Sequence, residues 1–288
     1  MQQVSALGAR LLRGAPNMVV SFGCDVLDSS LNITDTLSGG ATSDFVGGSV
    51  KRAMDASIHG TCSLQVARKL EWGRVLLRPW MRLHDAADTT LSERWNTGVY
   101  AVTTPTTVTG ESVITYSVEG FDRLYLLDRL VGDTYSVGAG VKYLDAIRAV
   151  VAASGVPVST ILLDTTAAAT TVPTALTWPL VKPKPAAADA DTSEVAQSPT
   201  SDDSGPATWL RIINDLLAAI GYRGLWADEN GYYRSEPYVA PAQRGSQWMF
   251  TVYGAATQVA DQRTLTRDEW SAPNKWVFVR RQTDATPV

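Results

Sequence analysis

The chain has 288 residues, 45% of them hydrophobic and 19% charged, with a formal net charge of −4 at pH 7. This length and composition are ordinary for a folded protein of two or three domains. The small acidic excess without a lysine or arginine cluster argues against nucleic-acid binding, and the lack of any apolar run near ~18 residues argues against a membrane segment.

The N-terminal part predicts an arm followed by short strands. Residues 1–17 lack the charged start and apolar centre of a secretory signal. Their spaced apolar residues Val4, Leu7, Leu11 and Leu12 predict a short amphipathic helix or an arm. Met18–Leu27 is rich in β-branched residues and Leu31–Thr36 alternates apolar with polar residues, which predicts two strands. The glycine- and serine-rich Leu37–Gly48 predicts a loop, and Ser57–Leu70 predicts another alternating strand.

The next strand, Val75–Leu83, carries a row of arginines. Arg74, Arg78 and Arg82 recur every fourth residue, so all three project to the same side of an extended chain. Pro79 cannot donate to a ladder and therefore predicts an edge strand or a bulge. The row is either a solvated strand face or a set of interface residues that pair with carboxylates of a neighbouring subunit or line a lumen. We keep the three arginines as interface candidates.

Two further strands complete the first β region. Gly98–Val102 and Val113–Val118 read as strands joined through a turn region at Thr103–Gly110, which is rich in threonine and also carries proline and glycine. Glu119–Asp122 ends the second strand, and Asp122 can cap a short helix. The leucines of that helix would be Leu124, Leu127 and Leu130. Five or six short strands over about 100 residues favour a closed or half-closed antiparallel barrel.

Helical spacing begins after this region. Val141–Ala153 has apolar residues at helical intervals and is stopped by Ser154-Gly155. Val158–Leu163 is short and apolar and predicts an extended segment. Thr165–Pro206 is low in complexity, rich in proline and acidic toward its end, which predicts an exposed, flexible loop or a segment that wraps around a partner. Order returns with the amphipathic helix Thr208–Ile220, which Ser204 or Thr208 would cap and Gly221 would end.

The last part predicts β structure. Tyr222–Ala227 and Tyr232–Glu236 flank Asp228-Glu229-Asn230-Gly231, and Asn-Gly between two aromatic strands is a strong hairpin signal. Trp248–Tyr253 and Lys275–Arg280 read as strands of a final β unit, and Trp276 is a further interface candidate there. We therefore expect a mainly β, α+β protein. Its expected parts are an N-terminal arm at 1–17, a first β-barrel at 18–130, an α/β domain at 131–238 interrupted by the loop 165–206, and a partial second β domain at 239–288.

No constellation for catalysis can be assembled from the sequence. The two histidines, His59 and His84, lie outside any hydrolase, metal or nucleotide motif, so we expect no catalytic residue, no cofactor and no metal site. The acidic residues of 189–203 lack the spacing of a calcium loop and predict a solvated loop. Cys24 and Cys62 exclude a disulfide framework but leave one bridge open.

Two stretches resemble a known family. The strand GVYAV, a hairpin and the run VEGFDRLYLL resemble the baseplate-hub or tail-tip proteins of tailed phages, in which a β-barrel is followed by G-x-D-x-x-x-x-L. Gly120, Asp122 and Leu127 match that pattern. The helix and hairpin of residues 208–236 are similar to the α/β insertion of the same family.

The resemblance implies a structural virion protein at the tail tip, a hub or minor tail protein, assembled in the host cytoplasm. It implies a homotrimer around the tail axis that forms a ring or channel joining the tail tube to the tip, with any DNA only passing through the lumen. The implied partners are the distal tail protein, the tape measure protein and other tail-tip proteins. A second barrel would be incomplete or would be completed by neighbouring subunits.

Two other classes of function stay open. Nine tryptophans could provide an aromatic platform for sugars, so the alternative is a carbohydrate-binding tail module that recognises the host cell wall. A small wall hydrolase is disfavoured by the missing catalytic set. The simpler interpretation of the tryptophans is that they fill cores and subunit contacts.

Overall fold

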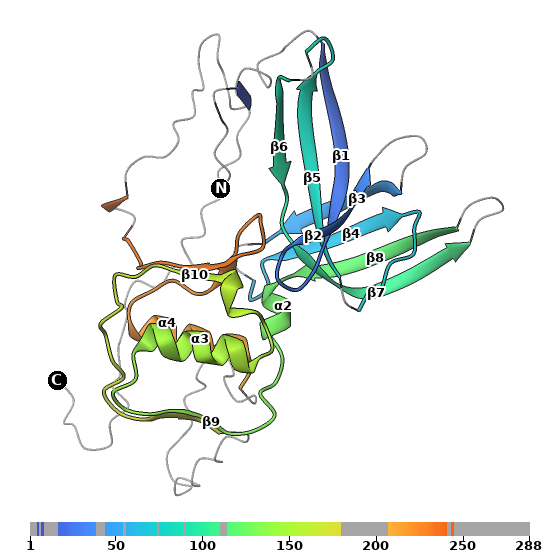
Figure 1. The fold of residues 1–288 in the computed structure, drawn as a ribbon. Coiled ribbons are helices and arrows are strands. Elements are labelled where there is room, and N and C mark those ends of the chain that lie inside the picture. The colour runs from blue at the N-terminus through green and yellow to red at the C-terminus, as the bar shows by residue number, and fades with distance from the viewer. Residues whose placement is uncertain are drawn as a thin grey trace, which may run out of the picture. The chain divides into compact units, whose positions relative to one another are not determined.

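The computed structural model describes residues 5, 7–8, 17–38, 44–53, 56–73, 75–88, 90–109, 114–179, 207–240 and 243–244. The chain divides into two units, Met1–Tyr238 and Val239–Val288. The description below concerns the first, whose elements are labelled in Figure 1. The described part contains no helix that is both long enough and apolar enough to span a membrane.

One antiparallel sheet dominates the first half of the chain. Its strands follow the order β2-β1-β5-β7-β8-β4-β3, and β6 pairs with β5 beside that path. The path has two ends, and no ladder joins β2 to β3 among the described residues. The expected mainly β, α+β class is confirmed, with a large antiparallel sheet that no ladder closes into a barrel among the described residues. The strands are β1 Met18–Leu27, β2 Ile33–Ser38, β3 Phe45–Arg52, β4 Gly60–Val66, β5 Leu76–Asp85, β6 Ser92–Asn96, β7 Tyr100–Thr109 and β8 Ile114–Asp122.

The sheet folds around a core of its own. Burial along β4 alternates residue by residue, with Cys62, Leu64 and Val66 buried, as expected for a strand with one face on a core. Strands from both ends of the path contribute to the same cluster, which explains why the sheet curves. The buried members are Cys24, Val26, Leu37, Phe45, Cys62, Leu64, Val66, Leu77, Tyr100 and Val118.

Two predicted loops are strand instead. The segment Leu37–Gly48 was expected to be a loop, but β2 runs to Ser38 and β3 begins at Phe45, with a register shift near Gly47 that accommodates the glycines. The predicted turn region Thr103–Gly110 continues β7 to Thr109, because its β-branched threonines pair along β8. Pro105 is tolerated there because β5 pairs with β7 only at Tyr100 and Ala101. The polar strand β6 had no apolar alternation to reveal it.

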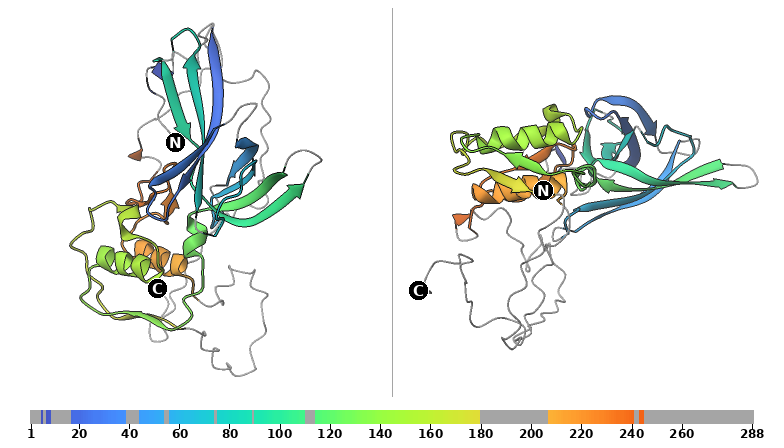
Figure 2. Two further views of the ribbon diagram at one scale, coloured as in Figure 1. Left: turned by 45° about the vertical axis from the view of Figure 1, so that its right-hand side comes forward. Right: turned by 90° about the horizontal axis from the view of Figure 1, so that it is seen from below.

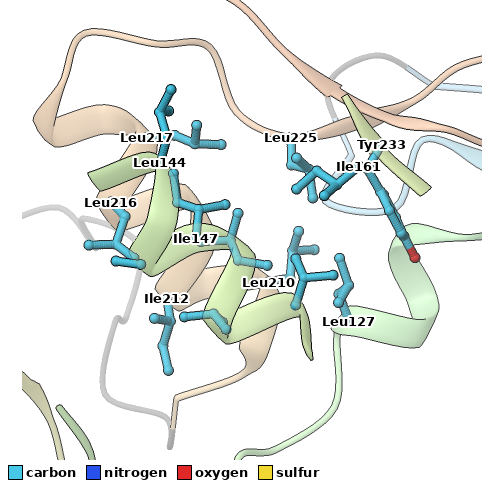
Figure 3. Close-up of a cluster of buried hydrophobic side chains, with 14 of the residues drawn as sticks. Leu127, Leu144, Ile147, Ile161, Leu210, Ile212, Leu216, Leu217, Leu225 and Tyr233 are labelled. Carbon is cyan, nitrogen blue, oxygen red and sulfur yellow. The ribbon is translucent and has the colours of Figure 1, made fainter. Parts of the chain in front are cut away.

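The second half of the first unit is built on two helices. The helices α3 and α4 lie side by side and bury one apolar cluster between them (Figures 2 and 3). A three-stranded sheet, β10-β13-β12, and the pair β9–β11 complete this part. Its elements are α2 Leu124–Leu127, β9 Tyr135–Val137, α3 Tyr143–Ala153, a 3-10 helix Val158–Thr160, β10 Ile161–Leu163, β11 Leu176–Trp178, α4 Trp209–Ala219, β12 Trp226–Ala227 and β13 Tyr233–Ser235.

Local signals set the ends of these elements. Thr208 caps α4, since its Oγ1 accepts a hydrogen bond from the amide of Arg211 at 3.2 Å. Gly221 follows α4 with φ +70°, the left-handed conformation that favours glycine. The helix α2 is shorter than expected and ends at Leu127, which leaves Leu130 outside it and exposed.

The predicted loop Thr165–Pro206 contains a strand. Its first part contains β11, which pairs antiparallel with β9, and Trp178 Nε1 donates to Asp215 Oδ2 of α4 at 2.8 Å. Residues 180–206 lie outside the described residues, as do the predicted strands Trp248–Tyr253 and Lys275–Arg280.

Candidate interaction site

The arginine-bearing strand β5 lies inside the sheet, not at an edge. Its whole length pairs with β1, while β7 pairs with Leu76 and Leu77 and β6 pairs with Trp80–His84 on the other side. Pro79 sits between these two partners, where no ladder requires its missing N–H. The Pro79 carbonyl instead accepts hydrogen bonds from the amide and the hydroxyl of Thr97, both at 2.9 Å.

A buried carboxylate organises this strand face. Asp25 of β1 is fully buried and lies opposite Arg78, whose Nε and Nη2 donate to Asp25 Oδ2 at 3.0 and 2.7 Å. Arg94 of β6 donates to the same oxygen. Removing one partner of a buried ion pair leaves an uncompensated charge, so these three residues depend on one another. Arg78 therefore stabilises the fold. A glutamate in its place would bring a second carboxylate against that of Asp25.

A tryptophan lies between two arginines on the same face. The guanidinium carbons of Arg94 and Arg82 are 4.7 and 5.5 Å from the centroid of the Trp80 ring, within cation–π range. Trp80 lies across Gly23 of β1, where a Cβ atom would come within 2.3 Å of the indole. Gly23 thus leaves room for this ring beside β1.

The structure describes two of the four predicted interface residues, Arg78 and Arg82. Arg78 and Arg82 share one face of β5, as expected, but only Arg82 is exposed and makes no ion pair among the described residues. Arg74 and Trp276 lie outside the described residues. The role of the row as an interface stays a prediction. Sequence reasoning missed Asp25, although a single acid inside the apolar strand MVVSFGCDVL is a signal that a cation must lie nearby.

The site is linked to the second half of the unit. Arg94 Nε donates to Asn96 Oδ1 at 3.1 Å, and Asn96 Nδ2 donates to Asn230 Oδ1 at 2.7 Å. Asn230 belongs to the predicted turn between β12 and β13. Asp228 closes that turn by accepting from the amide of Asn230 at 2.9 Å and from Arg234 Nε at 2.6 Å. The turn is structural, and it joins the sheet to the α/β part.

The residues that match the hub-family pattern meet at the same junction. Gly120 lies so close to β7 that a Cβ would come within 2.7 Å of the Ala101 carbonyl. Asp122 Oδ1 accepts from the amide of Leu124 at 3.0 Å and so starts α2, and Leu127 is fully buried. All three residues therefore position the change from β8 to α2.

The remaining sequence candidates take part in packing. Cys24 and Cys62 are free and buried in the sheet core, and burial raises the pKa of both thiols, that of Cys62 to about 12. His84 lies on β5, and its buried Nδ1 has no hydrogen-bond partner in the part of the chain that the structure describes. In the described residues no three His, Cys, Asp or Glu side chains form a group that could hold a metal ion.

No protein-family model matches the chain, and no curated protein is significantly similar to it. Among solved structures, a tail protein from Neisseria meningitidis is similar with 11% identity and a TM-score of 0.38, covering 74% of this chain and 50% of that one. The 43 kDa tail protein of a Shewanella oneidensis prophage is 12% identical, with a TM-score of 0.40 and coverage of 75% and 52%. A chain of a Francisella PdpA–VgrG complex is 8% identical, with a TM-score of 0.41 and coverage of 79% and 32%.

This chain thus spans about half the length of the two tail proteins and about a third of the VgrG-complex chain. A prophage tail protein from Listeria monocytogenes is a further neighbour of the same kind. The structural neighbours of this chain are phage tail proteins and chains of VgrG complexes.

Proposed function

We propose that this chain is a structural protein of a phage-like tail tip, a baseplate hub or minor tail protein with a mechanical rather than a catalytic role. The observation that carries the proposal is the junction between β8 and α2. Gly120, Asp122 and Leu127, the three residues through which the sequence resembles the hub family, each have a defined structural task there. All three residues of the pattern position the passage from β8 to α2. The resemblance therefore concerns the fold and not the composition alone.

The sheet also has the surfaces that an assembly would cover. Its path ends at β2 and β3, and apolar side chains are exposed at the far ends of the strands. Unpaired strand edges and exposed apolar groups invite pairing with another chain. These exposed residues include Val46 of β3, Val108 of β7 and Ile114 of β8.

On this basis we propose a homotrimer around the tail axis, forming a ring or channel that joins the tail tube to the tip. Its partners would be the distal tail protein, the tape measure protein and other tail-tip proteins. It would be assembled in the host cytoplasm and be present in the virion at the tail tip, with no cofactor in its function.

Sedimentation of the purified chain, together with a pull-down on host-wall polysaccharide, tests this proposal. A hub subunit should sediment as a trimer, or associate further, and should not be retained by the polysaccharide. A monomer that is stable to dilution and is retained by the polysaccharide would favour the carbohydrate-binding alternative and contradict the structural role.

A further inference from the structure

Over the first half of β1, one edge of the strand has no partner among the described strands. β5 pairs with all ten residues of β1, whereas β2 pairs only with Gly23–Leu27. Among the described strands, none pairs with the other side of Met18–Phe22. Figure 1 shows β1 continuing beside β5 and β6 beyond the end of β2. Among the residues that the structure describes, these five consecutive residues of β1 therefore have one backbone edge without a strand partner.

The direction of the free backbone groups follows from the ladder. The carbonyl of Asn17 accepts a hydrogen bond from the amide of Ala86 at 2.9 Å, which continues the pairing of β1 with β5 by one residue. Backbone groups in an antiparallel pair alternate between the two sides of a strand. The odd-numbered residues of Met18–Phe22 therefore direct their backbone groups at β5, and the even-numbered residues direct theirs at the open edge.

The side chains of this edge are apolar and exposed. Exposed edge strands are usually protected by charges, proline or a bulge, and Met18–Phe22 has none of these. Ser21 is its one polar residue. The exposed fractions are 39% for Met18, 40% for Val19, 41% for Val20 and 52% for Phe22. An edge of this composition is suited to being covered by another strand.

One charge lies within reach of that added strand. Ser21 pairs in register with Arg82, so both side chains lie on one face of the sheet. Arg82 is exposed and stacks against Trp80, and it makes no ion pair among the described residues. The residue of an added strand that lies opposite Ser21 would be two strand spacings, about 10 Å, from the backbone of Arg82. A glutamate and an arginine can span this distance across the small serine.

We infer that Met18–Phe22 is a docking edge for an extended, acidic segment of another protein. The segment adds to β1 as a strand, covers the apolar side chains with its own, and places a carboxylate opposite Ser21 where Arg82 pairs with it. The charges disfavour a second copy as the occupant. Its β1 edge, Met18–Phe22, carries no acidic residue, and the one acid of its β6 edge, Glu93, already accepts hydrogen bonds from Ser5. This inference does not depend on the proposed tail role.

Fluorescence polarisation with a short labelled peptide tests the inference on the full chain. The probe alternates threonine with valine and has glutamate at its centre, and the matched probe has lysine there. We expect the glutamate peptide to bind about fivefold more tightly, with a difference that shrinks at high salt. Arg82→Glu should reverse the preference. Binding of neither peptide in the millimolar range, or a preference that survives Arg82→Glu, would overturn the inference.

A backbone variant separates strand addition from other binding. Val20→Pro removes an N–H from the open edge without removing a bond to β5, so the fold should persist, as circular dichroism would show. It should abolish binding of the glutamate peptide, while Val20→Thr, which keeps the N–H, should retain it. Peptide binding that is equal in both variants would contradict docking at this edge. Self-association of the chain that is lost in Val20→Pro would make a second copy the occupant and would also overturn the inference.

Discussion

Arg123 Nη1 donates a hydrogen bond to the carbonyl oxygen of Gly231 at 2.6 Å, although the two residues are 108 positions apart. Arg123 directly follows β8, and Gly231 lies in the turn between β12 and β13. Arg123 Nη2 also donates to Thr160 Oγ1 at 3.1 Å, and its guanidinium lies 4.5 Å from the centroid of the Tyr233 ring. One buried cation therefore fastens the sheet to two separate segments of the α/β part, and burial lowers the pKa of its guanidinium.

Replacing this cation with a shorter one tests the junction. Arg123→Lys keeps the charge but cannot donate to both Gly231 and Thr160, so the free energy of unfolding should fall by about 2–3 kcal/mol. Urea denaturation followed by circular dichroism measures the change. The matched control is Arg129→Lys, because Arg129 is exposed and, among the described residues, donates its side-chain hydrogen bonds to backbone carbonyls. That variant should lose less than about 1 kcal/mol. Equal losses would show that the junction does not depend on Arg123.

The buried carboxylate of Asp25 should contribute far more to the free energy of unfolding than an exposed carboxylate does. Asp25→Asn leaves Arg78 and Arg94 facing a neutral group, so we expect a loss of about 3 kcal/mol in the free energy of unfolding. Asp35→Asn is the control, since Asp35 pairs with Arg68 where both side chains are well exposed. Its loss should stay below about 1 kcal/mol. A similar small effect in both variants would mean that Arg78 and Arg94 do not require their partner.

Much of this fold could be predicted because local patterns agree with the structure. The bounds of β1 match the expectation, and both long helices begin and end close to their predicted limits. Thr208, predicted as one of two possible caps of α4, and Gly221, predicted to end it, do so through the expected hydrogen bond and backbone angle. These signals act over a few residues and so remain visible in the sequence.

The errors came from interactions between distant residues. Thr103–Gly110 reads as a turn until β8 is present to pair with its threonines, and Pro79 reads as an edge residue until β6 and β7 divide one side of β5 between them. The candidate site shows the same limit. The arginine row was visible, but the partner of Arg78 lies 53 positions away on β1. Register between strands decides such pairs, and no local pattern encodes it.

Stability should respond to pH through Asp122. Burial raises the pKa of this carboxyl, so the folded chain holds its proton more tightly than the unfolded chain does. At neutral pH the buried, charged carboxylate lowers the stability of the folded chain. This loss is removed as the pH falls through the folded pKa toward the ordinary value of about 3.9. Relative to Asp122→Asn, the unaltered protein should become more stable as urea denaturation is repeated from pH 7 down to that range.

A second aspartate provides the control of opposite sign. Asp164 is exposed, and hydrogen bonds from Thr166 hold its pKa below the ordinary value. Its contribution should be present above the unfolded pKa and be lost as the pH falls through the lower folded value. Relative to Asp164→Asn, the unaltered protein should therefore become less stable at low pH. The same sign for both aspartates would contradict the buried position of Asp122.

The two thiols should be inert while the chain is folded. Cys24 and Cys62 are buried and free, and their raised pKa values leave little thiolate at pH 8. Ellman's reagent should detect almost no thiol in the native protein and both thiols in urea without any reductant. Absence of reactive thiol in urea would instead reveal the single bridge that the sequence left open.

The most direct measurement of the proposed role is the location of this chain in the assembled particle. Tails that carry an epitope-tagged copy can be labelled with gold-conjugated antibody and viewed by electron microscopy. The proposed role predicts label at the distal tip of each tail and none along the tube. Label along the tube, or intact and infective tails from which the chain is missing, would contradict a structural role at the tail tip.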